Sequence, residues 1–309
     1  MRRMRAVVSL AVAVGVAVAG AAGAAGTPPA GSAAEVHALV VASARITRVA
    51  PGVAAQLADP AALTTRFAFP AAGLGCYPPT PCAFGDRSST RLIVLFGDSH
   101  ALMWLPALDR LATARSLRVD VFWAPTCPLV VLAGLAYLDG GPRANCPTYR
   151  RAAIAAIRRL SPMLVVLAER TYQVVREPGA VPFTKAAWAA ALEATIRAVR
   201  SPSTKVALLE DVEAFRANPL QCLAAYPSDV QAHCSHANPS PEMPGEQAAE
   251  QLAAARTATL FVQTVPWFCD RRCSPIVGDY VVHYDQGHVA VPYAEYLSGV
   301  LDHALKPLL

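Results

Sequence analysis

The hydrophobic positions of the chain alternate between short uninterrupted apolar runs and longer stretches with helical spacing. The apolar runs, typical of parallel strands buried on both faces, are RLIVLF (91–96), RVDVFWA (118–124), MLVVLA (163–168), KVALLE (205–210) and ATLFVQTV (258–265). The stretches with helical spacing are residues 35–47, 101–116, 148–160, 184–200 and 292–308. This alternation predicts an α/β domain with a parallel sheet and helices on both of its faces.

Three features interrupt the pattern. Residues 68–90 are rich in turn-forming residues, and residues 215–247 contain many prolines and two cysteines. Pro106 lies inside the stretch 101–116, where its missing N–H predicts a kink or a delayed helix start.

The first 26 residues have the pattern of an export signal. A basic start, MRRMR, precedes the apolar stretch AVVSLAVAVGVAVAG, and the small residues 22–24 fit a cleavage site. The alternative is an uncleaved membrane anchor, because the apolar stretch is nearly long enough to cross a bilayer. Either reading predicts that the rest of the chain lies outside the cytoplasm. The predicted division is a signal at 1–26, a linker and helical extension at 27–74, and a catalytic domain at 75–309.

Composition and charge narrow the possible partners. The 309 residues are 54% hydrophobic and 16% charged, enough to bury a full α/β core. The formal net charge is +5, but Arg2, Arg3 and Arg5 supply three of these charges, which leaves +2 for the rest of the chain. No basic tract follows, so we expect no nucleic-acid partner.

The cysteines support export. The eight are Cys76, Cys82, Cys127, Cys146, Cys222, Cys234, Cys269 and Cys273. An even set in an exported chain predicts disulfides, and the chain order suggests the four local pairs 76–82, 127–146, 222–234 and 269–273. The alternative for the last pair is zinc binding by the Cys-x-x-x-Cys spacing.

The first apolar run ends at Gly97, Asp98, Ser99 and His100, and helical spacing follows. Reactive groups gather at the carboxyl ends of parallel strands, and a serine there has its own backbone N–H and the helix dipole available to an oxyanion. Ser99 is therefore a candidate nucleophile. The alternative is that Asp98 and Ser99 only cap the helix.

A nucleophilic serine needs a base and an acid that orients the base. Asp285 and His288, in HYDQGH before the last helical stretch, are three residues apart, which places them on the same side of one turn. The carboxylate can then hold the imidazole while the other ring nitrogen faces Ser99. The alternatives are a solvated surface loop, or capping of the last helix by His288.

Other chemistry-bearing residues have weaker patterns. A metal cluster is an alternative for the set Asp98, His100, His283, Asp285 and His288. The serine-centred arrangement explains Ser99, Asp285 and His288 together, so we expect neither a metal nor a cofactor. His233 and His236 are predicted to lie in a surface loop. Four tryptophans are predicted to be core, with one as a candidate sugar platform: Trp104, Trp123, Trp188 and Trp267.

The motifs GDSH and DQGH resemble those of the SGNH/GDSL hydrolase superfamily. Over residues 75–305 the chain more narrowly resembles the SGNH domain associated with acyltransferase-3 membrane proteins, in CAFGDRSSTRLIVLFGDSHALMWLPAL, in PTCP and in CDRRCSPIVGDYVVHYDQGH. The resemblance implies a flavodoxin-like, three-layer α/β/α sandwich. It also implies Ser99 as nucleophile, His288 as general base and Asp285 as the acid that orients it.

The chain departs from the superfamily at the oxyanion hole. Where those enzymes carry a Gly-x-Asn after the third strand, this chain has Ala168, Glu169 and Arg170. The oxyanion would rest on the Ser99 backbone N–H together with Arg170 or a backbone amide near Thr126. Loss of one such donor costs about 3–4 kcal/mol, so either one of these groups compensates for it or hydrolysis is slow. A site that is poor at hydrolysis would suit acyl transfer.

The resemblance implies an exported, serine-dependent O-acyl esterase or O-acyltransferase of the cell envelope. Its expected partners are an acylated or acceptor glycan or glycolipid and a membrane acyltransferase-3 protein that supplies the acyl group. The alternative is a non-catalytic, glycan-binding envelope protein that retains the SGNH fold.

Overall fold

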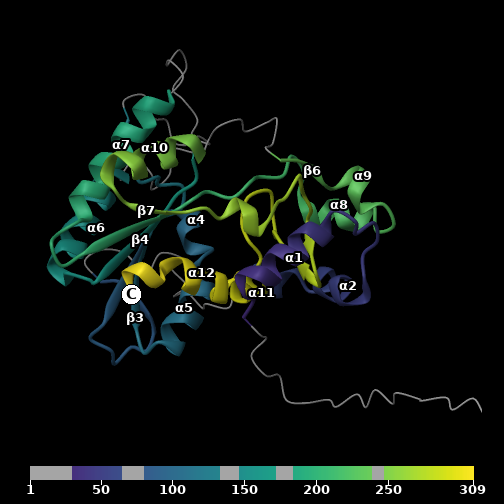
Figure 1. The fold of residues 1–309 in the computed structure, drawn as a ribbon, viewed down its shortest axis with the longest axis horizontal. Helices are drawn as coiled ribbons and strands as arrows, with labels where there is room; N and C mark the ends of the chain where they lie inside the picture. The colour runs from purple at the N-terminus through teal and green to yellow at the C-terminus, as the bar shows by residue number, and fades with distance from the viewer. Residues whose placement is uncertain (1–29, 65–79, 133–145, 172–183, 239–246) are drawn as a thin grey trace, which may run out of the picture.

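The computed structural model describes residues 30–64, 80–132, 146–171, 184–238 and 247–309. Its main element is a six-stranded sheet (Figure 1). The strand order is β1-β3-β2-β4-β5-β7. The strands are β1 (Cys82–Gly85), β2 (Leu92–Gly97), β3 (Arg118–Trp123), β4 (Leu164–Ala168), β5 (Lys205–Leu209) and β7 (Leu260–Val262). All pairings are parallel except that β1 runs antiparallel to β3. The five parallel strands have the flavodoxin-like order 2-1-3-4-5.

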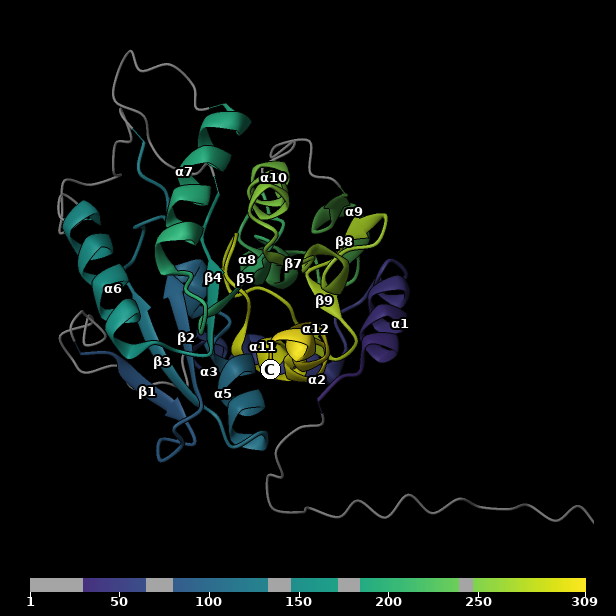
Figure 2. The same cartoon turned by 60° about the vertical axis from the view of Figure 1, so that its left-hand side comes forward.

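Helices cover both faces of this sheet, as the alternation of strands and helices predicts. Along β2, Ile93 and Leu95 face one layer, whereas Val94 and Phe96 face the other. The first layer comprises α1 (Ala33–Ser43), α5 (Leu105–Ala114), α11 (Val291–Tyr296) and α12 (Ser298–Leu305). The second comprises α6 (Cys146–Leu160), α7 (Lys185–Val199) and α10 (Gln247–Thr257). Figure 2 shows these layers on opposite sides of the strands, and the expected three-layer sandwich is confirmed.

The stretch 101–116 forms two helices rather than one. A short helix, α4 (Ser99–Leu102), directly follows β2, and α5 begins three residues after α4 ends. Pro106 lies in the first turn of α5, where its missing N–H leaves no hydrogen bond unmade. The delayed helix start is therefore confirmed, and α4 is a separate helix at the end of β2.

The remaining elements are short, and most of them pack together beside the sheet, whereas the 3₁₀ turn Lys306–Leu308 lies against β5 and α12. They are α2 (Pro51–Ala58), α3 (Pro60–Thr64), α8 (Pro219–Ala225), α9 (Val230–His233), β6 (His236–Ala237), β8 (Arg272–Cys273), β9 (Ile276–Val277), β10 (Tyr280–Val281) and two 3₁₀ turns, Val265–Trp267 and Lys306–Leu308. A separate apolar cluster joins Val53 of α2, Leu223 of α8 and Val281 of β10. The Val230 N–H donates to Thr47 O at 2.9 Å, which ties the N-terminal helices to the proline-rich region.

Three of the predicted disulfides are present: Cys127–Cys146, Cys222–Cys234 and Cys269–Cys273. The last pair is therefore bridged, and the zinc alternative for it is wrong. Cys82 is also disulfide-bonded, but its predicted partner Cys76 lies outside the described residues. The predicted signal at 1–26 lies outside them as well. Among the helices that the structure describes, none has the length and apolarity needed to cross a bilayer.

Candidate active site

The turn between β2 and α4 is built around a glycine that the sheet requires. Gly97 pairs with Ala168 of β4, and a Cβ at Gly97 would lie 1.8 Å from the Ala168 carbonyl oxygen. Asp98 then caps α4, because its Oδ1 accepts a hydrogen bond from the His100 N–H at 2.8 Å. Its Oδ2 accepts from the Arg170 N–H at 3.0 Å, which ties the ends of β2 and β4 together. Asp98 is therefore the N-cap residue of α4, and the Ser99 side chain does not cap the helix.

Ser99, His288 and Asp285 form one hydrogen-bonded chain. The Ser99 Oγ lies 2.8 Å from His288 Nε2, and His288 Nδ1 lies 2.7 Å from Asp285 Oδ2. The three residues come from opposite ends of the sequence, yet each meets its expected neighbour. This is the geometry that a nucleophile, a base within reach of it and an acid that orients the base require.

The loop that carries the base is held by its own backbone. Asp285 Oδ1 accepts from the N–H groups of Gly287 (2.9 Å) and His288 (2.7 Å), and the Tyr284 ring stacks on the His288 ring with centroids 5.4 Å apart. Desolvation by burial opposes ionisation of Asp285, but its hydrogen bonds to the His288 side chain and the two N–H groups outweigh this. The pKa of Asp285 therefore lies well below its usual range. An ionised Asp285 fixes the His288 tautomer with Nε2 toward Ser99.

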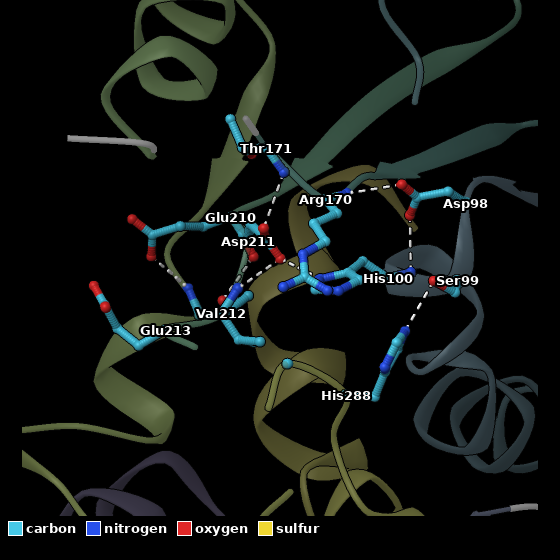
Figure 3. Close-up of polar contacts among 12 residues, drawn as sticks. Asp98, Ser99, His100, Arg170, Thr171, Glu210, Asp211, Val212, Glu213 and His288 are labelled. Atoms are coloured by element: carbon cyan, nitrogen blue, oxygen red, sulfur yellow. Dashed lines mark hydrogen bonds and ion pairs between the residues drawn. The ribbon is translucent and has the colours of Figure 1, made fainter. Parts of the chain in front are cut away.

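A second histidine–carboxylate pair lies beside the Ser99–His288 pair (Figure 3). His100 Nδ1 contacts Asp211 Oδ1 at 2.6 Å, and the two residues are only 2% and 3% exposed. Asp211 Oδ2 accepts from the Thr171 N–H, and the Asp211 N–H donates to Glu250 Oε2. The His100 and His288 rings are 4.8 Å apart. The pair thus connects the turn of Ser99 to the end of β5 and, through Glu250, to α10.

The same region buries carboxyl groups that resist ionisation. Desolvation raises the pKa of Asp98 and, with help from a neighbouring carboxylate, that of Glu250. Burial and the nearby Asp98 also raise the pKa of Glu169 to about 8. Glu169 nevertheless accepts hydrogen bonds from the Leu129 N–H and from Trp188 Nε1. It is therefore a buried side chain that is hydrogen-bonded within the core.

We expect Glu169→Gln to change how stability depends on pH. A carboxyl whose pKa is higher in the folded than in the unfolded protein contributes its full stabilisation at pH values below the pKa of the unfolded protein. This contribution is lost as the pH rises to the pKa of the folded protein. For Glu169 the window runs from about 4.5 to about 8. As pH rises through this window, the free energy of unfolding of Glu169→Gln should increase by on the order of 4 kcal/mol relative to that of wild type. This holds even if the variant is the less stable protein at pH 5. Urea denaturation at pH 5 and pH 8 measures this difference, and a wild type–variant gap that is equal at both values would contradict it.

The oxyanion donors differ from what the superfamily pattern provides. The Arg170 N–H is already donated to Asp98, so only the Arg170 side chain remains as its possible contribution. Thr126, the other candidate, has a φ of 55°, which is the left-handed region and unfavourable for a β-branched residue. Strain of this kind gathers at functional sites. The Ser99 N–H and an amide near Thr126 stay predicted donors.

The other residues singled out in the sequence have varied surroundings. Within the described ranges, no three His, Cys, Asp or Glu side chains are grouped to hold a metal ion. His283 is buried between the rings of Phe215 and Phe268. His233 stacks on Tyr226. Three of the four tryptophans are buried as predicted, namely Trp104, Trp188 and Trp267, whereas Trp123 lines a cavity together with Ser99.

Comparison with known proteins places this chain in a family. Residues 66–303 match the model of the SGNH domain that is fused to AT3 domains. The chain belongs to this family. No curated protein matches the sequence. Among solved structures, the SGNH domain described here is similar to the periplasmic domain of the lipopolysaccharide acetyltransferase of Salmonella ser. Paratyphi A, with a TM-score of 0.54, 16% identity, and coverage of 69% of this chain and 82% of that one. At this identity the likeness shows the fold alone.

Sequence reasoning anticipated the contacts of Ser99, His288 and Asp285 but missed the contact between His100 and Asp211. His100 was considered only as the last residue of GDSH and as a member of the alternative metal set. Asp211 follows the run KVALLE at residues 205–210, and its place after a buried strand was the one available signal.

Proposed function

We propose that this SGNH domain is an exported, serine-dependent O-acyl esterase or O-acyltransferase that acts on glycans or glycolipids of the cell envelope. The hydrogen-bonded chain from Ser99 through His288 to Asp285, with contacts of 2.8 and 2.7 Å, carries the proposal. The family's fusion to AT3 domains and the periplasmic acetyltransferase domain with the same fold support acyl chemistry outside the cytoplasm.

In the first half-reaction, Ser99 takes the acyl group. The Oγ attacks the carbonyl carbon of the acyl donor while its proton passes to His288 Nε2. The oxyanion of the tetrahedral intermediate faces the Ser99 N–H. As the bond to the leaving oxygen breaks, His288 returns the proton to that oxygen, and Asp285 stabilises the imidazolium without taking its proton. The products are an acyl-serine and the released alcohol.

In the second half-reaction, the acyl group leaves Ser99. A sugar hydroxyl (transfer) or water (hydrolysis) attacks the acyl carbon, His288 accepts the proton of the attacking oxygen, and the proton then returns to Ser99 Oγ. Because the asparagine donor of related enzymes is missing, turnover in water should be slow. A bound and oriented sugar hydroxyl offsets this disadvantage, which favours transfer.

The proposal implies a partner in the membrane. Since the family's SGNH domain is fused to AT3 domains, we propose that a membrane acyltransferase-3 protein supplies the acyl group to this chain. The second candidate is a glycan-binding protein without catalysis, which the missing oxyanion asparagine favours.

A fluorophosphonate probe separates the two candidates. We expect the purified protein to be labelled at Ser99, because attack by Oγ displaces fluoride and His288 accepts the proton. Peptide mapping by mass spectrometry locates the adduct. Ser99→Ala should remain unlabelled, and so should wild-type protein unfolded in urea. A folded protein that stays unlabelled at a large excess of probe would rule out the catalytic proposal in favour of binding.

A further inference from the structure

The Ser99–His288 pair opens onto a cavity of about 360 Å³. Leu102 and Met103 lie three and four residues after Ser99, so these side chains follow it on one side of the turn where α4 ends. Val289 and Val291 enter from the segment that follows His288. The segments that carry the nucleophile and the base therefore also build the cavity wall.

The wall is apolar apart from the reacting groups. Trp123, from the end of β3, and the rings of Pro106 and Pro125 complete it, and Thr64 and Tyr284 add the other hydroxyl groups. Of the described residues that line the cavity, none carries a formal charge apart from His288 when protonated. A sugar or an anion needs hydrogen-bond partners or opposite charges when it loses its water, whereas a hydrocarbon needs none. This lining therefore fits the hydrocarbon part of a substrate.

The size of the cavity indicates how large that part is. An apolar cavity of about 150 Å³ holds a benzene molecule, which is already larger than the methyl and carbonyl of an acetyl group. The cavity beside Ser99 has more than twice this volume. An acetyl group on Ser99 would leave most of the wall without contacts.

We propose that this cavity binds the hydrocarbon of an acyl group larger than acetyl, of about four to eight carbons, while that group is attached to Ser99. The inference rests on the proposed function, since it needs Ser99 Oγ to form an ester with the acyl carbon as the bond to the leaving oxygen breaks. It goes beyond that function by naming the acyl class: a medium-length or branched chain, held between α4 and the segment after His288.

The test is the chain-length dependence of the p-nitrophenol burst with acetate, butyrate, hexanoate and octanoate esters on the full chain. Each methylene buried in the cavity should raise the acylation kcat/KM about fourfold. Hexanoate should therefore exceed acetate on the order of 100-fold. An acylation rate that is equal for all esters or highest for acetate would overturn the inference.

Leu102→Trp fills the cavity and should lower the hexanoate-to-acetate ratio at least tenfold. The ratio is the readout because it is insensitive to the fraction of folded enzyme. Leu102→Ala, which enlarges the cavity, should move the optimum toward octanoate. Leu160→Trp, a matched change at the exposed end of α6, should leave the ratio unchanged. An unchanged ratio in both Leu102 variants would also overturn the inference.

The test distinguishes this inference from the proposed function on which it rests. Absence of a burst with every ester would mean that Ser99 is not acylated, and both would fall. A burst without chain-length preference would leave the catalytic proposal standing and remove the acyl cavity. A Leu102→Trp variant that loses sugar-stimulated release but keeps the wild-type ester ratio would assign the cavity to the glycan instead.

Discussion

Ser99→Ala is expected to lower kcat/KM for p-nitrophenyl butyrate about 10⁶-fold, which leaves only the residual acceleration that substrate binding and the remaining oxyanion donors supply. The alanine has no oxygen to take the acyl group, while His288 and Asp285 retain their own contact of 2.7 Å. His288→Ala should have a similar effect, and the double variant should be no worse than either single one, because the three residues act as a unit.

Asp285→Asn should be less damaging, with a loss of about 10⁴-fold, because the acid orients the base and does not itself handle the proton. Initial rates with each variant, at equal concentrations of folded protein by circular dichroism, measure the series. Activity that survives Ser99→Ala but disappears with a chelator would contradict the serine mechanism and favour the metal alternative.

Gly97→Ala is expected to prevent or severely weaken folding, by about 4 kcal/mol or more. The new methyl carbon would lie 1.8 Å from the Ala168 carbonyl oxygen and 2.7 Å from Ala101 Cβ. Neither neighbour can move freely, since one is backbone of the central strand β4 and the other lies in α4. Relief therefore requires β2 and β4 to separate at the end that carries Ser99.

Gly52→Ala is the matched control. Gly52 lies in α2, and nothing is within 4 Å of the Cβ that alanine would add. Because alanine is the better helix former, this variant should be unchanged or up to about 1 kcal/mol more stable. Urea midpoints of both variants and wild type measure the effect. A Gly97→Ala midpoint equal to that of wild type would contradict this prediction, because it would show that β2 and β4 can separate near Ser99 at little cost in stability.

The strands and the facing helices were predictable because their signals are local. The central apolar runs became β2, β3, β4, β5 and β7 with shifts of one or two residues at most ends, and up to three in β7. The edge strand β1 and helix α10 were missed. β1 is only four residues long and half-exposed, and the sequence of α10, QAAEQLAAART, is so rich in alanine that its apolar side is indistinct. Both are fixed by their neighbours in the fold.

In the site too, local patterns were predictable from the sequence and long-range contacts were not. Ser99, Asp285 and His288 were predictable because each lies in a short pattern whose chemistry has few other uses. The contact between His100 and Asp211 spans 111 positions, and that of Asp211 with Glu250 a further 39. Contacts of this kind depend on which strand ends the sheet brings together. The sheet order, rather than any local pattern, determines them.

The distance along the chain between Ser99 and His288 has a consequence for the timing of activity. The two residues are 189 positions apart, and His288 precedes only the last two helices, α11 and α12. A chain that is synthesised from its N-terminus presents the serine long before the histidine. Under the proposed function, the Ser99 hydroxyl gains its base only when the segment before α11 has folded and these last helices have packed against α5.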